Sequence, residues 1–228
     1  MGLSQLNRPA VLSRLGTPLV IGLGCAVVFL VLFAMLAEEM LEGDTRQFDD
    51  TVRLFVHAHS STELTVIMRF LSAIGSPLVV TLTAIAACIA LWIVGHPRRA
   101  ILIAVTAGGG GLLMWVLKTG FHRPRPVPFF DTRLPASYSF PSGHAMLSFC
   151  LCLSAAALFS ASQKSRLVRA VIWIFWVSLS GAIGYSRIYL GVHYPSDVIA
   201  GYLAALVWSL AVGSAYQKWR KSPPLPVA

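Results

Sequence analysis

A cluster of basic side chains follows one of the long apolar runs of this sequence and has the composition of an anion-binding site. Lys118, Arg123 and Arg125 fall within eight residues, and His122 adds a group that becomes positive when protonated. Planar guanidinium groups form paired hydrogen bonds with tetrahedral oxyanions, and a lysine supplies a concentrated positive charge. The cluster indicates a site for a phosphate-like ligand, with an ordinary basic patch beside a membrane as the alternative.

A second candidate is the run Pro-Ser-Gly-His at residues 141–144, at the start of another apolar run. Ser142 can cap a helix, and Gly143 lets the backbone approach a ligand closely. The N-terminus of such a helix binds anions through its backbone N–H groups and its dipole. His144 would lie in the first turn, where it can protonate a leaving oxygen, although a capped helix followed by a histidine is commonplace on its own.

The third cluster contains Ser186, Arg187, His193 and Asp197, and it bridges two apolar runs. A carboxylate four residues after a histidine can fix the imidazole tautomer and stabilise the cation that forms when the histidine attacks. Many surface helices carry this spacing, so the nearby arginine and the apolar runs supply much of the argument. We expect His193 to be an exposed side chain at a helix end.

The composition indicates what kind of element must hold these clusters. The 228 residues are 56% hydrophobic and only 12% charged, and the mean hydropathy is +0.72. Soluble domains carry roughly 25% charged residues, so lipid must surround much of this chain. The net charge is +9, but the basic residues lie in short clusters between apolar runs, which argues against nucleic-acid binding. The four cysteines lie within apolar runs and show no zinc-binding or disulfide pattern.

Six apolar runs are long enough to cross a membrane as helices, which takes about 20 residues each. We therefore predict an all-α fold, a bundle of six transmembrane helices, as a single domain over residues 1–228. The first run is expected to remain as a span, because no convincing signal-peptide cleavage site follows it. The Pro-rich tail at 222–228 is expected to be disordered. The predicted spans cover approximately residues 18–37, 77–94, 100–117, 142–161, 168–185 and 197–216.

The charges between these runs predict the orientation of the bundle. Positive charge marks the cytoplasmic side of a membrane protein, so both termini are expected inside the cell and the three polar clusters outside. Basic clusters that set topology lie on the cytoplasmic side, whereas the cluster at residues 118–125 is predicted to lie outside. This location favours a role in ligand binding. The inner side holds ten basic residues and no acidic one: Arg8, Arg14, Arg98, Arg99, Lys164, Arg166, Arg169, Lys218, Arg220 and Lys221. All nine acidic residues fall on the outer side: Glu38, Glu39, Glu42, Asp44, Asp49, Asp50, Glu63, Asp131 and Asp197.

Between the first two spans lies a polar stretch, residues 38–76, that contains one amphipathic pattern. Phe48, Val52, Phe55 and Val56 recur at helical spacing. One interpretation is an outward-facing amphipathic helix that lies on the outer leaflet and shapes a lipid entrance. The other is a connector that packs against the bundle, and the pattern does not choose between them.

Taken together, the three clusters resemble the type 2 phosphatidic acid phosphatase superfamily, which also includes lipid phosphate phosphatases and vanadium haloperoxidases. Its signature is Lys-x6-Arg-Pro, then Pro-Ser-Gly-His, then Ser-Arg-x5-His-x3-Asp. Every specified position is matched here, in the same order and with the same internal spacing. The matching residues are Lys118, Arg125, Pro126, Pro141, Ser142, Gly143, His144, Ser186, Arg187, His193 and Asp197.

The resemblance implies a mechanism and a role for each matched residue. His193 would attack phosphorus and form a phosphohistidine, while Asp197 orients and polarises it. His144 would act first as general acid to the leaving group and then as general base to water. No metal and no cofactor are expected. The phosphate oxygens would be held by Lys118, Arg125, Arg187, Ser142 and the backbone N–H of Gly143.

The resemblance to bacterial members also implies a substrate class and a location. The expected substrate is a lipid phosphate or diphosphate in the outer leaflet of the bacterial inner membrane, such as undecaprenyl diphosphate, phosphatidylglycerol phosphate, phosphatidic acid or a lipid A phosphate. Phe129, Phe130, Tyr138 and Phe140 could line an entrance for the lipid tail or could be ordinary interfacial aromatics. Two alternatives remain: a lipid phosphotransferase with the same phosphohistidine, and a non-enzymatic binder or transporter of anionic lipid. The sequence does not predict an oligomeric state.

Overall fold

The computed structural model describes residues 17–130 and 134–220, and within these ranges every regular element is a helix. The predicted disordered tail at 222–228 lies outside the described residues, as do the charged residues Arg8, Arg14, Asp131 and Lys221. The helices are α2 (Thr17–Glu42), α3 (Thr45–Ala58), α4 (Thr62–Ile74), α5 (Pro77–Ile93), α6 (Pro97–Phe121), α7 (Gly143–Ala161), α8 (Arg166–Tyr189) and α9 (Pro195–Arg220).

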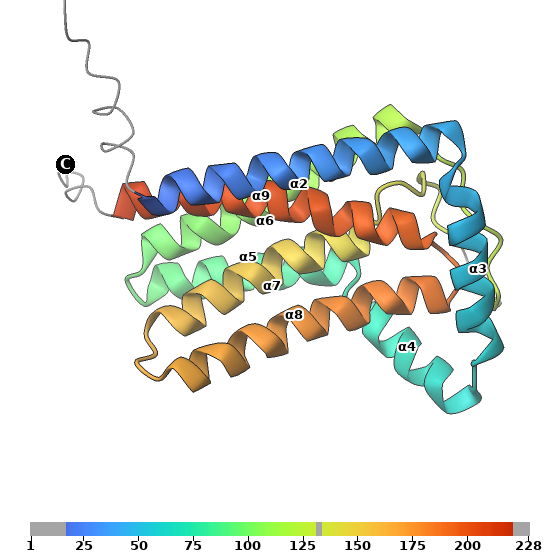
Figure 1. Ribbon diagram of the computed structural model, residues 1–228. Coiled ribbons are helices and arrows are strands. Elements are labelled where there is room, and N and C mark those ends of the chain that lie inside the picture. The colour runs from blue at the N-terminus through green and yellow to red at the C-terminus, as the bar shows by residue number, and fades with distance from the viewer. Residues whose placement is uncertain (1–16, 131–133, 221–228) are drawn as a thin grey trace, which may run out of the picture.

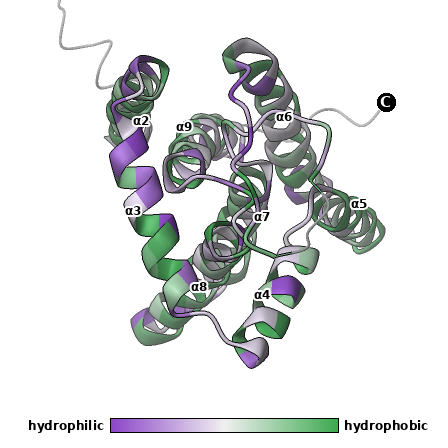
Figure 2. Cartoon of the chain, turned by 90° about the vertical axis from the view of Figure 1, so that its right-hand side faces the viewer, coloured by the Kyte–Doolittle hydropathy of each residue, from purple (hydrophilic) through white to green (hydrophobic). Residues whose placement is uncertain are grey.

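Six long helices lie side by side, and two shorter ones lie at one end of the bundle (Figure 1). Helix α7 is at the centre of the end view, where it packs against α6, α8 and α9 (Figure 2). Helix α2 packs along α9 on one side, and α5 packs against α6 on the other. Helix α3 crosses the end of the bundle, and α4 leads back from it along α8.

Five of the described helices, namely α2, α6, α7, α8 and α9, are long and apolar enough to cross a membrane. Helices α4 and α5 pass the same test only together, as a broken span bent by 50°. The chain is an integral membrane protein with five or six candidate spans, and the predicted all-helical class is confirmed. The second predicted span, at 77–94, corresponds to the short helix α5.

The first span extends further than the sequence predicted. Helix α2 continues past residue 37 to Glu42, because Leu, Met, Ala and Glu all favour a helix even where the chain leaves the apolar region. It ends at Gly43, whose φ of 92° suits glycine and places its N–H on the carbonyl of Glu39. The chain then turns sharply into α3 and brings that helix across the end of the bundle.

The buried face of α3 is largely polar. Phe48 and Phe55, from the predicted apolar pattern, are 48% and 66% exposed. The amphipathic pattern therefore located the helix but did not indicate which face the bundle covers. The side chains that point inward are Thr45, Asp49, Arg53 and Val56.

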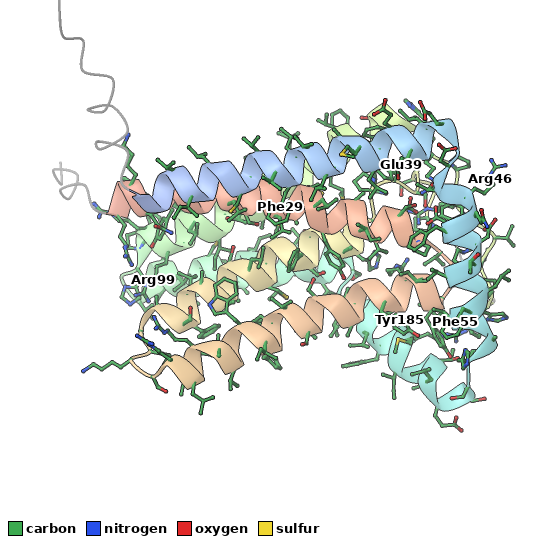
Figure 3. All side chains as sticks on the ribbon, viewed as in Figure 1. Phe29, Glu39, Arg46, Phe55, Arg99 and Tyr185 are labelled. Atoms are coloured by element: carbon green, nitrogen blue, oxygen red, sulfur yellow. The ribbon has the colours of Figure 1, made fainter. Side chains whose placement is uncertain are left out.

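The two ends of the bundle differ in their charges. Figure 3 shows Arg99 at one end and Arg46 and Phe55 at the other. The end with Arg99 also holds the loop before Arg166 and the C-terminal turn of α9, which contains Lys218. The opposite end holds α3 and all three of the polar clusters found in the sequence.

Candidate active site

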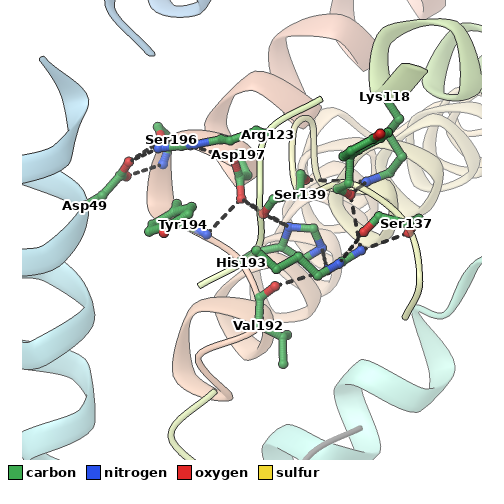
Figure 4. A network of polar contacts seen from close by, with 12 residues as sticks. Asp49, Lys118, Arg123, Ser137, Ser139, Val192, His193, Tyr194, Ser196 and Asp197 are labelled. Atoms are coloured by element: carbon green, nitrogen blue, oxygen red, sulfur yellow. Dashed lines mark hydrogen bonds and ion pairs between the residues drawn. The ribbon is translucent and has the colours of Figure 1, made fainter. Parts of the chain in front are cut away.

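The loops after α6 and α8 meet at the end of the bundle that α3 crosses (Figure 4). Lys118 lies in the last turn of α6 and Arg187 in the last turn of α8, whereas Asp197 lies in the first turn of α9. Gly143 begins α7, and a Cβ atom there would lie 2.5 Å from Met114 Sδ. A side chain at this position would displace Met114, so glycine suits the close approach of α7 to α6 beside the Lys118 side chain.

His193 lies in the turn between α8 and α9 and contacts both of its predicted neighbours. Its Nδ1 is 3.2 Å from Asp197 Oδ2, and its Nε2 is 3.0 Å from Nη1 of Arg125. A guanidinium group can only donate hydrogen bonds, so Nε2 must accept and Nδ1 must carry the proton. The lone pair of the ring is consequently on Nε2, where it accepts a hydrogen bond from Arg125.

The expectation that His193 is exposed is wrong, because only 1% of it is accessible. Ser139, from the loop before α7, covers the ring and lies 3.3 Å from Nδ1. Burial lowers the pKa of His193 to about 3, even though Asp197 favours the charged form, and Arg125 and Arg187 lower it further. The imidazole is therefore neutral at physiological pH, as a nucleophile must be.

Asp197 is fully buried, and both of its carboxylate oxygens are occupied. Oδ2, which faces His193, also accepts hydrogen bonds from Ser139 Oγ and from the backbone N–H of Tyr194 at 2.9 Å. Oδ1 accepts from Arg123 Nη1 at 2.7 Å. The part played by Ser139 could not be predicted, because a serine three residues before a helix cap has no chemical signature.

The three predicted phosphate-binding cations have only neutral partners in the described part of the chain. Lys118 Nζ donates to the carbonyl of Tyr138 at 2.5 Å, and Arg187 Nη1 donates to Ser72 Oγ. Arg125 donates to Ser137 through both Nε, at 2.7 Å, and Nη2, at 3.1 Å. Buried cations without a carboxylate partner are costly. Their concentration beside a histidine suits the binding of an anion.

Two polar atoms at the site are buried without any hydrogen-bond partner among the described residues: Ser142 Oγ and Arg187 Nε. Ser142 is the N-cap residue of α7, but its hydroxyl does not cap the helix, and its N–H donates to the carbonyl of Asp197 at 2.9 Å. Buried polar atoms normally find partners. Both of these belong to residues that the sequence predicted to hold phosphate.

His144 is half-buried in the first turn of α7. Arg187, His193, Arg125 and Lys118 all act on it electrostatically, so it lies within the same cluster of charges. This location suits a group that exchanges protons with a bound phosphate ester.

The aromatic residues before α7 are mostly packed inside the protein. Tyr138 is 42% exposed, whereas Phe140 is fully buried in the core between α2 and α6. Phe129 stacks on His57, with ring centroids 4.1 Å apart, and Phe130 stacks on Tyr189. Only Tyr138 therefore keeps the exposure that an interfacial aromatic or a tail entrance needs.

The sequence placed Arg123 in the anion-binding cluster, but the structure pairs it with two carboxylates. Arg123 donates to Asp197 and, through Nη2, to Asp49 Oδ2 of α3 at 2.8 Å. Asp49 also accepts from the N–H and the hydroxyl of Ser196, at 2.9 and 2.6 Å. Arg123 lies between two residues of the first motif, but that motif specifies neither it nor any residue of α3.

The similarity of this chain to known proteins extends beyond the three motifs. Residues 99–221 match the model of the PAP2 superfamily. The undecaprenyl-diphosphatase of Sulfolobus acidocaldarius is 32% identical over 102 residues, 45% of this chain and 45% of that protein. Phosphatidylglycerophosphatase B of Bacillus subtilis is 34% identical over 116 residues, 50% of this chain and 56% of the relative. The matches thus span about half the length of these two relatives.

The fold also has a counterpart among solved structures. The crystal structure of a transmembrane PAP2-type phosphatidylglycerolphosphate phosphatase from Bacillus subtilis superposes with a TM-score of 0.78 at 23% identity. The superposition covers 86% of this chain and 98% of that one, so it includes the helices that precede the family match.

Proposed function

This chain belongs to the PAP2 superfamily, and from that premise we propose that it hydrolyses a phosphate or diphosphate group of a membrane lipid through a phosphohistidine at His193. The proposal depends on the side chains that surround His193. A neutral imidazole with its lone pair on Nε2 lies among the half-buried Arg125 and the buried Lys118 and Arg187, which have no carboxylate partner in the described residues. Orphaned atoms of Ser142 and Arg187 leave hydrogen-bonding capacity for a tetrahedral anion.

In the first step, the lone pair of His193 Nε2 forms a bond to phosphorus as the bond to the leaving oxygen breaks. Arg125 must release Nε2 as substrate binds, and its guanidinium then turns to a phosphate oxygen. His144 donates a proton to the leaving oxygen. The positive charge that develops on the imidazole is stabilised by Asp197, which accepts the Nδ1 proton in a hydrogen bond.

In the second step, water attacks the phosphorus of the phosphohistidine and His144 accepts its proton. The bond from phosphorus to Nε2 breaks, inorganic phosphate leaves, and His193 returns to its neutral state. Phosphoryl transfer depends mainly on positioning and on charge stabilisation. Lys118, Arg125 and Arg187 supply that stabilisation, with Ser142 Oγ and the Gly143 N–H at the start of α7 completing the set.

The topology that we propose has six spans, with α4 and α5 forming the second as a broken helix and both termini in the cytoplasm. The basic loops lie at the end of the bundle opposite the site, in support of this orientation. The exposed Phe48 and Phe55 of α3 then face the outer leaflet. The substrate is a lipid phosphate or diphosphate of that leaflet, in a bacterial inner membrane.

The test is phosphate release by the purified protein from mono- and diphosphorylated lipids, with and without excess EDTA. We expect release without an added acceptor, persistence in EDTA, and an acid-labile, base-stable phosphoenzyme that the His193→Gln variant does not form. Phosphate appearing only when a lipid or sugar hydroxyl is supplied would indicate a transferase instead. Binding of the whole lipid panel without release would refute the enzyme assignment.

A further inference from the structure

Arg123 connects α3 to the carboxylate behind His193. Its two terminal nitrogens divide between two buried acids: Nη1 binds Asp197 Oδ1 at 2.7 Å, and Nη2 binds Asp49 Oδ2 at 2.8 Å. Both carboxylate side chains are fully buried, and the arginine side chain is 12% exposed. Figure 4 shows the resulting line of contacts from Asp49 through Arg123 and Asp197 to His193.

Arg123 and His193 contact different oxygens of the Asp197 carboxylate: Arg123 contacts Oδ1 and His193 contacts Oδ2. A carboxylate held at one oxygen only can rotate and carry its second oxygen away from the imidazole. Arg123 Nη1 at Oδ1 opposes that rotation, while the N–H of Tyr194 holds Oδ2. Arg123 itself stacks over the Tyr194 ring, 4.1 Å from its centroid, so its own position is fixed.

Asp49 determines how much of the negative charge of Asp197 is left for His193. Arg123 alone would neutralise Asp197 and so weaken the stabilisation of a positively charged imidazole. With Asp49 on its other nitrogen, the three charges sum to one negative charge. Burial alone would lower the pKa of Arg123, but Asp197 and Asp49 outweigh it and raise the pKa, so the guanidinium stays charged.

We propose that Arg123 and Asp49 are positioning residues that hold Asp197 in register with His193, which makes α3 part of the catalytic unit. The inference rests on the proposed function, and it concerns two residues outside the three sequence motifs. Neither residue contacts the site of phosphorus attack. Their removal should slow the chemical step and leave substrate binding nearly unchanged.

The first measurement is the separation of kcat from KM in Arg123→Gln and Asp49→Asn. We expect kcat to fall roughly 10- to 100-fold in Arg123→Gln and by less in Asp49→Asn, with KM within about threefold of wild type. Arg123→Lys, which keeps the charge, should recover part of the loss. A wild-type kcat in Arg123→Gln, or a KM that rises as much as kcat falls, would overturn the proposal.

Arg53 provides a matched control for the docking of α3. It lies one helical turn after Asp49, is 8% exposed, and donates to the carbonyl of Val127 at 2.8 Å without touching Asp197. We expect Arg53→Gln to lower the melting temperature while kcat stays within about threefold of wild type. An equal loss of kcat in Arg53→Gln and Arg123→Gln would show that α3 acts only through fold stability, and the proposal would fail.

Arg123→Gln leaves the buried carboxylates of Asp49 and Asp197 without their cation, which could prevent folding. The double variant Asp49→Asn with Arg123→Gln is therefore included. It removes both charges together but still deprives Asp197 of its Oδ1 partner. A folded double variant with a low kcat and a normal KM supports the positioning role. A folded double variant with wild-type kcat refutes it.

Chemical rescue gives a readout that a purely structural role would not affect. A cavity of about 380 Å³ that is partly open to the surface is lined by Arg123, Tyr194, Asp50 and His122 among others. Free guanidinium ion at tens of millimolar should therefore restore part of the kcat of Arg123→Ala and leave Arg53→Ala unchanged. Equal responses of the two variants would count against the inference.

These outcomes can be distinguished from failure of the proposed function. If wild type releases phosphate and His193→Gln does not, the phosphohistidine mechanism stands whatever the Arg123 variants show. If the wild type releases no phosphate from any lipid tested, the proposed function fails first and the inference falls with it.

Discussion

Arg123 and Arg125 are separated by a single residue, yet the structure uses them in opposite ways. Arg123 is held between two buried carboxylates, at 2.7 and 2.8 Å. Among the described residues Arg125 binds neutral groups only, including the carbonyl and hydroxyl of Ser137 and the lone pair of His193. Lys118 and Arg187 resemble Arg125 in this respect within the described chain.

The comparison separates a balanced region from an unbalanced one. In the balanced region, around Asp49, Arg123 and Asp197, every charge has an opposite neighbour, so this region holds its geometry without a ligand. In the unbalanced region, around Arg125 and Arg187, positive charge is concentrated, and no carboxylate among the described residues pairs with it. His193 lies at the boundary and contacts both, through Asp197 on one side and Arg125 on the other.

Replacement of the boundary residue should have the largest effect. His193→Gln keeps most of the buried volume and an amide for hydrogen bonding, but it removes the proposed nucleophile. We expect kcat to fall by about 10⁴-fold or more, measured as phosphate release, with the thermal unfolding of the variant in detergent as the control for folding. More than a few per cent of wild-type activity would exclude His193 as the nucleophile.

Arg187→Met tests the unbalanced region, and its effects on activity and stability should have opposite signs. We expect kcat/KM to fall by roughly 10²- to 10³-fold, because one cation around the phosphate oxygens is lost. The melting temperature should stay equal or rise, since a buried charge with no carboxylate partner in the described residues is replaced by an apolar side chain.

The matched change in the balanced region is Arg123→Gln, which should lower the melting temperature because it strands two buried carboxylates. A large loss of stability in Arg187→Met, or none in Arg123→Gln, would contradict the distinction between the two regions. Inorganic phosphate should raise the melting temperature of wild type more than that of Arg187→Met, because the anion binds the folded site.

The sequence predicted the unbalanced region far better than the balanced one. The resemblance to a known family implied that Lys118, Arg125 and Arg187 share a site with His193, because its three motifs match at every specified position. It could not find Asp49, whose partner Arg123 lies 74 residues away, or Ser139, whose partner Asp197 lies 58 residues away. Such contacts depend on how whole helices pack, which no local pattern encodes.

The sequence left open which face of α3 is covered and was wrong about the exposure of His193, and both have the same origin. Periodicity located α3 correctly, but the bundle covers its polar face, since Arg123 and the loop carbonyl of Val127 provide partners for Asp49 and Arg53. His193 was expected to be exposed because it lies beside a helix end. The loop that carries Ser139 buries it instead.

Ser139→Ala should have a smaller effect than the charge variants, and it should act on a single kinetic constant. Its hydroxyl donates to Asp197 Oδ2, so its loss weakens the support of His193, and we expect kcat to fall about tenfold with KM unchanged. Ser137→Ala is the control, because that hydroxyl contacts Arg125 and its loss should alter KM more than kcat. If Ser139→Ala instead altered KM more than kcat, and Ser137→Ala altered kcat more than KM, Ser139 would belong to the unbalanced region.

The smallest effect that we expect is the contribution of His193 to the pH dependence of stability. Its pKa is lowered to about 3 in the folded protein by burial, whereas an unfolded chain has the ordinary value near 6.5. Between these values the unfolded chain binds a proton that the folded protein does not, so stability is complete above about pH 6.5 and is lost as the pH falls towards 3. Acidification from pH 7 to 4.5 should lower the melting temperature of wild type by more than that of His193→Gln. Equal slopes would mean that the imidazole is already charged in the folded state, and the balanced region would then be supplying a full counter-charge before any substrate binds.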